Sequence, residues 1–213
     1  MEKLIIVGAG GFRREVAWLA EQIHGESLKK VFAVDDRRYL VPEINNIPVC
    51  LLEEIQKEKD THFVIAVGDP KLRHHLASNV STHGFSATRL IHPRAEISRW
   101  VEIGNGSIIC AGVIITTNIK IGGHVHINLD CTIGHDVEIS DFSTLSPGVH
   151  ISGNVKIGSN VFIGTGANII NGTNNNPLII HDNAVIAAGA CIIQDVESNT
   201  LVAGVPAVKK KLL

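Results

Sequence analysis

An aliphatic side chain returns at every sixth position from residue 91 to residue 169, and the residue four places after each one is small or β-branched. The aliphatic series is Ile91, Ile97, Ile103, Ile109, Ile115, Ile121, Ile127, Ile133, Ile139, Leu145, Ile151, Ile157, Ile163 and Ile169. A period of six fits neither the 3.6-residue turn of a helix nor a plain alternating strand. It is typical of a parallel β-helix, in which short strands wind into a coil and equivalent positions stack.

The first 90 residues follow another pattern. Apolar runs at 3–7, 31–34 and 63–67 and shorter ones at 47–49 and 86–90 predict strands, whereas residues 16–23, 51–57 and 71–79 have helical spacing. Alternation of strands and helices favours a parallel sheet covered by helices, a small Rossmann-like α/β domain. The mixed strand-and-helix pattern gives way to the period of six around His92-Pro93, so we divide the chain into two domains, residues 1–90 and residues 91–213. Near 171–178 the repeat loses phase in a turn-forming stretch, which predicts a loop protruding from the coil.

Composition limits the function classes. A formal net charge of -2 with mixed signs gives no electrostatic reason to bind nucleic acid or an anionic membrane. We find no leader pattern and no apolar run long enough for a membrane span, so we expect a cytoplasmic protein. The four cysteines lack CxxC spacing and are interpreted as small buried hydrophobic residues. No histidine pair has H-x4-H spacing, so we expect no metal.

The first candidate site follows the first strand. Gly8-Ala9-Gly10-Gly11 ends that strand and precedes a helix, where backbone N–H groups can hold a phosphate. The full GxGxxG pattern is absent because Arg13 occupies its last position. A tight strand-to-helix turn without a ligand is the simpler alternative for this motif.

The next two strands also end in candidate binding residues. Asp35-Asp36 follows the second strand, where such folds place a carboxylate for a ribose, and Gly68-Asp69 follows the third. An exposed acidic turn would explain the two aspartates equally well. Because all three strand ends meet at one edge of a parallel sheet, together they favour a nucleotide-type ligand.

His135-Asp136 is the candidate for chemistry in the coil. Equivalent positions three hexads apart stack roughly 4.8 Å from one another, so His135 lies in a column with Thr117, Gly153 and Asn171. A carboxylate beside an imidazole orients the ring and favours its charged form, which suits a general base. Gly153 lets a substrate approach the backbone, and its N–H could polarise a carbonyl. We expect Asn128 near the same edge; the simpler interpretation is that His135 is one of eleven histidines on the surface.

Seven segments of the chain resemble those of a known protein family and occur in the same order as in that family. They are LIIVGAGGF, VFAVDD, FVIAVGD, LIHPRA, INLDCTIGHDVEIS, LSPGVHISGNVKIG and LVAGVPA. With them the chain resembles, over essentially its whole length, the sialic-acid/bacillosamine-type sugar O- and N-acyltransferases of the left-handed β-helix superfamily, which modify nucleotide-linked amino sugars for bacterial glycans. The left hand of the coil is implied by this resemblance alone.

The resemblance implies a role for each candidate residue. His135 would be the general base oriented by Asp136, Gly153 would offer its N–H to the thioester carbonyl, and Asn128 would lie near the acceptor. The glycine turn and the aspartate pair would hold the nucleotide. Acetyl-CoA, or another acyl-CoA, would lie between subunits of a homotrimer along positions that include the C-terminal tail: Thr165, Ala188, Gly189 and Lys209.

Two departures from the family pattern affect these expectations. Phe12-Arg13-Arg14 stands where many relatives have Gly-His-Gly or Gly-His-Ala, and Phe12 and Arg13 are expected to contact the substrate, Arg13 through a phosphate. Thr144 stands where some relatives have a second histidine near the acyl carbonyl. We therefore predict N-acetylation of the amine of a nucleotide-activated 4-amino sugar without a metal. O-acetylation of a sugar or sialic acid hydroxyl and a non-catalytic nucleotide-sugar-binding trimer remain alternatives.

Overall fold

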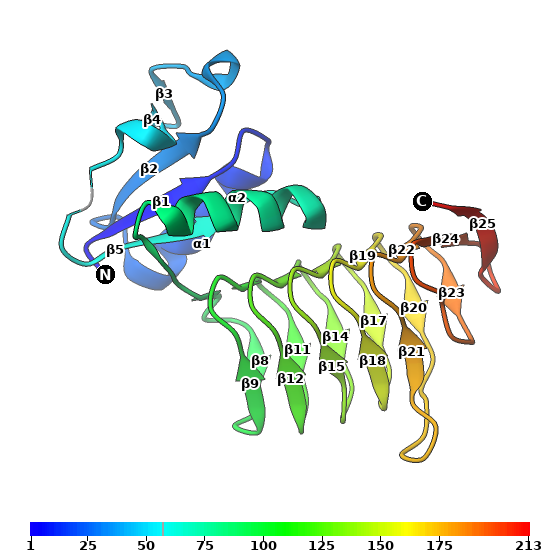
Figure 1. Cartoon of the computed structure of the whole chain (residues 1–213). Helices are drawn as coiled ribbons and strands as arrows, with labels where there is room; N and C mark the ends of the chain where they lie inside the picture. The colour runs from blue at the N-terminus through cyan, green and yellow to red at the C-terminus, as the bar shows by residue number, and fades with distance from the viewer. Residues whose placement is uncertain (57) are drawn as a thin grey trace.

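A computed structural model describes residues 1–56 and 58–213. Its N-terminal part is one sheet with helices on its faces, and a coil of stacked strands follows (Figure 1). The elements of the N-terminal part are β1 (Lys3–Val7), α1 (Phe12–His24), β2 (Lys29–Val34), η1 (Arg37–Tyr39), β3 (Glu43–Ile44), β4 (Ile47–Leu51), η2 (Leu52–Glu54), β5 (Thr61–Ile65), α2 (Pro70–Thr82) and β6 (Ser86–Ala87). The strand order is β3-β4-β2-β1-β5-β6, parallel except for the β3–β4 hairpin.

Three sheets form the walls of the coil. Sheet 1 contains β7 (Leu90–Ile91), β10 (Ile108–Ile109), β13 (His126–Ile127), β16 (Thr144–Leu145), β19 (Phe162–Ile163), β22 (Val185–Ile186), β24 (Thr200–Ala203) and the antiparallel β25 (Val208–Leu212). Sheet 2 contains β8 (Glu96–Ile97), β11 (Ile114–Ile115), β14 (Thr132–Ile133), β17 (His150–Ile151), β20 (Asn168–Ile169) and β23 (Cys191–Ile192). Sheet 3 contains β9 (Val101–Ile103), β12 (Ile119–Ile121), β15 (Glu138–Ile139), β18 (Val155–Ile157) and β21 (Leu178–Ile180). From β7 to β23 the chain visits the sheets in this order, turn after turn, as a β-helix requires.

The three edges between these sheets position the site residues. We call the edge between sheets 1 and 2 corner A, the edge between sheets 2 and 3 corner B, and the edge between sheets 3 and 1 corner C. Asn118, Asp136 and Asn154 are equivalent residues at corner B in three successive turns of the coil, and each has a φ of 57°. Asparagine and aspartate tolerate this left-handed conformation better than other side chains. Asp136 is therefore also the residue type that this turn requires.

The series of hexads fills the inside of the coil. The stacked aliphatic residues and the small residues four places later form one continuous core, with Ile127, Ile133 and Ile139 each at most 2% exposed. Pairing partners lie three hexads apart up to Ile151–Ile169, whereas Ile157 pairs with Ile180. The repeat predicted this core because every third hexad returns to the same wall.

The N-terminal domain lies against sheet 1 at the first coils (Figure 1). Arg73 of α2, which is fully buried, joins the two parts: it donates to the carbonyls of Val67 and Gly68 in its own domain and to those of His124, Phe142 and Ser143 in the coil. The Phe142 ring lies between those of His74 and His124, with centroids 4.2 and 5.0 Å away. Corners A and C flank this contact, so corner B is the edge opposite the N-terminal domain.

Two element predictions were wrong. Residues 51–57 were expected to be helical, but Leu51 is the last residue of β4 and only the short 3-10 turn η2 follows it. Lys57 lies outside the described residues. The single strand expected at 86–90 is two strands, with β6 in the N-terminal sheet and β7 in sheet 1 of the coil.

Candidate active site

Corner B holds His135 and Asp136 in direct contact. The His135 Nδ1 lies 2.8 Å from the Asp136 Oδ2, and the side chains are 58% and 44% exposed. A carboxylate can only accept, so Nδ1 donates in this bond and Nε2 keeps its lone pair. The hydrogen bond from His135, with a smaller contribution from Asn118, lowers the pKa of Asp136. The pair therefore presents an unprotonated nitrogen to solvent, backed by a carboxylate whose pKa is lowered.

Gly153 lies directly against the His135 ring. A Cβ on Gly153 would be 2.6 Å from both Cε1 and Nε2 of the imidazole, a distance that real Cβ atoms essentially never show. The Gly153 N–H donates to no other described residue. The imidazole therefore needs a glycine at this position, and the backbone N–H of that glycine is free to donate.

Asn118 supports Asp136 from the preceding turn of the coil. Its Nδ2 lies 3.3 Å from the Asp136 Oδ1, so both carboxylate oxygens are engaged. We did not predict this residue. The spacing of the columns could have found it, because Asn118 stands three hexads before Asp136.

A second site lies at the carboxyl edge of the N-terminal sheet. A cleft of about 540 Å³ opens there, and seven of the predicted substrate-binding residues line it. They are Gly8, Gly10, Gly11, Phe12, Asp35, Asp36 and Gly68. This edge therefore gathers the three strand ends that the sequence pointed to.

The walls of this cleft suit a nucleotide-type ligand. Gly8 has φ of 143°, and a Cβ there would lie 2.8 Å from the Ala66 carbonyl oxygen, so the turn after β1 requires glycine. No side chain caps the start of α1 at Gly11. Asp36 is bonded to Arg38 at 2.6 Å, and this hydrogen bond lowers its pKa. The start of α1 therefore offers N–H groups to an anion, and Asp35 remains the carboxylate without an arginine partner among the described residues.

Arg13 and Asp69, which were expected to bind the substrate, do not line this cleft. The Arg13 side chain is 6% exposed, donates to the Gly8 carbonyl at 3.2 Å and lies over the Phe32 ring, so it supports the turn from below and does not reach the cleft. Asp69 caps α2, with Oδ1 accepting from the Leu72 N–H at 2.7 Å. The sequence alone could not separate a binding role from these local structural roles, because residues at the start of a helix serve both.

Thr144 and Asn128 do not lie beside His135 of the same chain, which corrects a second expectation. Thr144 is in sheet 1, 3% exposed, and donates its hydroxyl hydrogen to the Gly68 carbonyl at 2.9 Å. Asn128 follows β13 at corner A and donates to the Leu145 carbonyl. Each lies on the side of the coil that the N-terminal domain covers, because one hexad turns the chain by one full edge.

The residues implied for the coenzyme are divided between corner A and the C-terminal end. Thr165, Ala188 and Gly189 are exposed at corner A in successive coils, and the Gly189 N–H donates to the Thr165 carbonyl. Lys209 is in β25 and pairs with Glu197 at 2.6 Å. None of these four lies at corner B.

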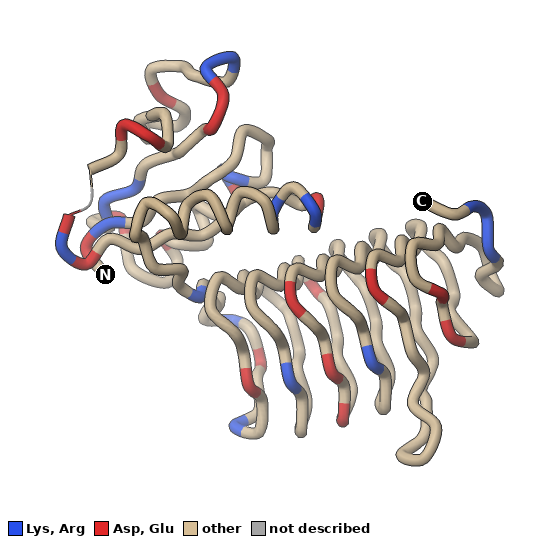
Figure 2. The backbone as a smooth tube through the Cα atoms, in the orientation of Figure 1, with Lys and Arg blue, Asp and Glu red and all other residues tan. Residues whose placement is uncertain are grey.

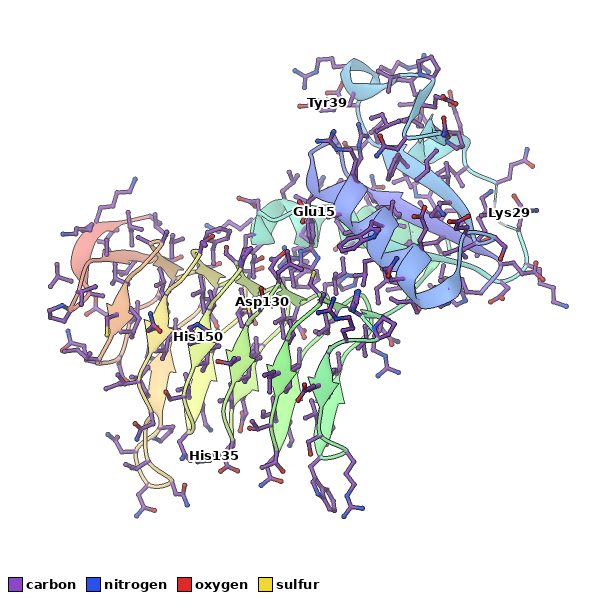
Figure 3. All side chains as sticks on the ribbon, turned by 180° about the vertical axis from the view of Figure 1, so that it is seen from behind. Glu15, Lys29, Tyr39, Asp130, His135 and His150 are labelled. Atoms are coloured by element: carbon purple, nitrogen blue, oxygen red, sulfur yellow. The ribbon has the colours of Figure 1, made fainter. Side chains whose placement is uncertain are left out.

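The catalytic candidates and the cleft are on opposite sides of the chain. In Figure 3, His135 is at the lower edge of the coil, whereas Glu15 of α1 and the rest of the N-terminal domain lie above its upper edge. Corner B is also the edge that faces away from sheet 1, where the domain is attached. Within one chain, the cleft and His135 therefore lie on opposite sides of the coil.

Two buried histidines near the domain contact have no catalytic geometry. Burial lowers the pKa of His124 to about 4 and that of His126 well below its ordinary value, and the charge of Arg73 adds to both effects.

Residues 1–56 and 58–213 contain no group of three or more histidine, cysteine, aspartate or glutamate side chains arranged for a metal. All four cysteines are free, and Cys110 and Cys131 are buried. No helix in the same residues is long and apolar enough to cross a membrane.

Comparison with known proteins identifies the family. A GDP-perosamine N-acetyltransferase from Escherichia coli O157:H7 is 34% identical over 183 residues, which are 82% of this chain and 81% of the relative. Residues 3–80 match the PglD N-terminal domain family. The chain belongs to the nucleotide-amino-sugar acetyltransferases of the hexapeptide-repeat superfamily. The family resemblance and the two-part fold predicted from the sequence are thus confirmed, and the chain is an acetyltransferase.

Solved structures of this family superpose over nearly the whole chain. The acetyltransferase domain of PglB from Neisseria gonorrhoeae FA1090 has a TM-score of 0.88 and 32% identity, covering 99% of this chain and 100% of that one. A histidine variant of perosamine N-acetyltransferase from Caulobacter crescentus, in complex with CoA and GDP-perosamine, has a TM-score of 0.89 and 27% identity over 98% of this chain and 97% of that one. The PglB domain was also solved with acetyl coenzyme A.

Proposed function

We propose that this chain transfers an acetyl group from acetyl-CoA to the amine of a nucleotide-activated 4-amino sugar. The proposal rests on one observation above the others: a His135–Asp136 pair with a free Nε2 stands against the glycine backbone of Gly153. That geometry fits an amine attacking a thioester. The names of the relatives support the choice of amine over hydroxyl, since those proteins are N-acetyltransferases of perosamine.

In the proposed reaction, Nε2 of His135 accepts the proton that the sugar amine loses as its nitrogen bonds to the thioester carbon. Asp136 steadies the imidazolium that forms, and Asn118 holds the carboxylate in place. The N–H of Gly153 donates to the carbonyl oxygen as it becomes an oxyanion. Collapse of this intermediate breaks the carbon–sulfur bond and releases coenzyme A as its thiolate, which then takes up a proton.

We propose that the complete site forms between chains of a homotrimer. The cleft and His135 face opposite directions in one chain, so a neighbour must supply one of them (Figure 3). Sheet 2 is the face best suited to contact a neighbour, because five of the six residues that its strands turn outward are uncharged: Ile114, Thr132, His150, Asn168 and Cys191, with Glu96 as the exception. Sheet 3 instead turns alternating charges to solvent at Glu102, Lys120, Glu138 and Lys156 (Figure 2).

This arrangement of chains gives a role to the predicted site residues that do not lie at corner B. Corner B of one chain would face corner A of the next, so that Asn128, Thr165, Ala188 and Gly189 of the neighbour lie across from His135 and line the path of the coenzyme. The cleft in the N-terminal domain would hold the nucleotide, with phosphate at the start of α1 and Asp35 at the ribose. We place this reaction in the cytoplasm, where acetyl-CoA and nucleotide sugars are made.

The test is a product assay with His135→Ala as the matched variant. Purified protein is incubated with acetyl-CoA and a panel of nucleotide 4-amino sugars, and products are identified by mass spectrometry. We expect one acetyl group on the sugar nitrogen, and a kcat lower by ~10²–10⁴ in His135→Ala with coenzyme A binding unchanged. A nearly normal rate in the variant contradicts the role of His135, and acetylation at oxygen contradicts the choice of acceptor.

A further inference from the structure

One turn of the coil carries an insertion at corner B. Ile139 pairs with Ile157, three hexads later, whereas Ile157 pairs with Ile180, where three hexads would have led to position 175. The additional residues lie between Ile169 and Leu178, in the turn from sheet 2 to sheet 3. They protrude beyond the edge of the coil (Figure 1).

The base of this protrusion, which we call the corner-B hairpin (residues 171–177), is fixed to the proposed active site. The Gly172 N–H donates to the Gly153 carbonyl at 3.0 Å, and the Leu178 N–H donates to the Asn154 carbonyl at 3.1 Å. Gly153 and Asn154 are the residues stacked directly on His135 and Asp136, since the Asn154 N–H donates to the His135 carbonyl. The hairpin therefore begins one turn of the coil beyond Gly153, the residue proposed to bind the thioester carbonyl.

The hairpin carries no charged side chain, and its tip presents three side-chain amides. Its ends pair through Thr173 and Asn176, whose backbone N–H and carbonyl groups bond in both directions at 2.9 and 3.1 Å. The side chains of Asn174, Asn175 and Asn176 are exposed and bond to no other described residue. They can both donate and accept, as a partner that itself contains amides requires.

The coenzyme of the proposed reaction is such a partner. Its pantetheine arm contains two amide groups between the sulfur and the phosphates. The thioester carbonyl would lie at Gly153, and the arm would run from there toward the level of Thr165 on the neighbouring chain. Thr165 and the hairpin belong to the same turn of the coil, so the arm must pass the hairpin. We propose that the corner-B hairpin binds the amide-containing arm of the acyl thioester coenzyme through Asn174–Asn176. This inference rests on the proposed function.

The test removes the hairpin without disturbing the coil. A Cβ on Gly172 would lie 2.4 Å from the Leu178 nitrogen, so the two ends of the loop already touch. Deleting residues 173–177 joins them and restores the step of three hexads. We expect the Kd for coenzyme A, measured by calorimetry, to rise at least tenfold, as the loss of one or two net hydrogen bonds implies, while Tm and the affinity for the nucleotide sugar change little.

A second variant keeps the hairpin and removes its amides. Asn174→Ala/Asn175→Ala/Asn176→Ala should weaken coenzyme A binding about tenfold, whereas the control Glu138→Gln, on the charged face of sheet 3, should leave it unchanged. Unaltered coenzyme affinity in either hairpin variant, with the fold intact by Tm, overturns the inference. If the wild type binds coenzyme A through the hairpin but acetylates no amino sugar, the proposed function fails alone; if it acetylates and the hairpin variants behave as wild type, the inference fails alone.

Discussion

Arg73 joins the two domains, and its removal is the most demanding test of how the fold is held together. Its guanidinium is fully buried, and burial lowers its pKa to about 9 against the opposing effect of Asp69. It is the only described donor to the carbonyls of Val67, His124 and Phe142. Replacing it with leucine would leave these three partly buried oxygens without a protein donor, one on the domain side and two on the coil.

Each unpaired buried carbonyl costs about 1–3 kcal/mol, and the variant is relieved of the cost of burying the guanidinium. We therefore expect Arg73→Leu to lose about 3 kcal/mol of the free energy of unfolding, the lower end of the range for breaking a buried charge interaction. For a chain of this size that corresponds to a Tm lower by roughly 6–12 °C. Scanning calorimetry measures this loss as a lower Tm of the whole chain.

The control is Arg89→Leu. Arg89 also donates to a backbone carbonyl across the domain boundary, that of Ile103 at 2.9 Å, but it is exposed. Its replacement should move Tm by less than about 2 °C, since exposed substitutions usually stay within about 0.5 kcal/mol. If Arg73→Leu unfolds at the temperature of the control, the buried guanidinium does not hold the domains together and the reasoning is refuted.

Two further predictions concern acid and the active-site glycine. His124 and His126 are neutral in the folded state because burial lowers their pKa. Below pH ~6.5 the unfolded chain therefore binds more protons than the folded chain. As the pH falls, each histidine then lowers the free energy of unfolding by up to about 1.4 kcal/mol per pH unit. Tm should therefore fall from pH 7 to pH 5, and fall less in His126→Leu; equal falls would contradict the assignment. Gly153→Ala should reduce kcat at least ~10²-fold with little change in Tm, because its Cβ displaces the His135 ring; normal turnover would show that the ring position does not matter.

The sequence predicted the coil in detail because its core repeats. Every third hexad must return to the same wall, so periodicity alone located the walls of the coil, and the resulting columns placed Gly153 against His135. The family resemblance placed the reaction at this pair. The turn-forming composition of 171–177 predicted the loop, which is also the corner-B hairpin.

Other features depend on contacts that no periodicity encodes. Arg13 and Arg73 look like surface arginines in their helices, yet both side chains are buried and satisfy backbone carbonyls. Asn128 stands close before His135 in the sequence, but one turn of a three-walled coil takes three hexads, so it lies at another edge. Thr144 was assigned by analogy to a histidine, and its hydroxyl is engaged by the N-terminal domain, a contact visible only in three dimensions.

The central claim is that acetylation needs His135 from one chain and the nucleotide cleft from another. Two inactive variants test it: His135→Ala, and Gly10→Trp, whose side chain would fill the cleft because nothing lies within 4 Å of a Cβ at that position. Each variant alone should be inactive. Co-expressed in equal amounts, they should recover about one quarter of wild-type activity per chain, because half of the chains supply His135 and half of their neighbours supply an open cleft. A mixture as inactive as its components would place both halves of the site in one chain and contradict the account.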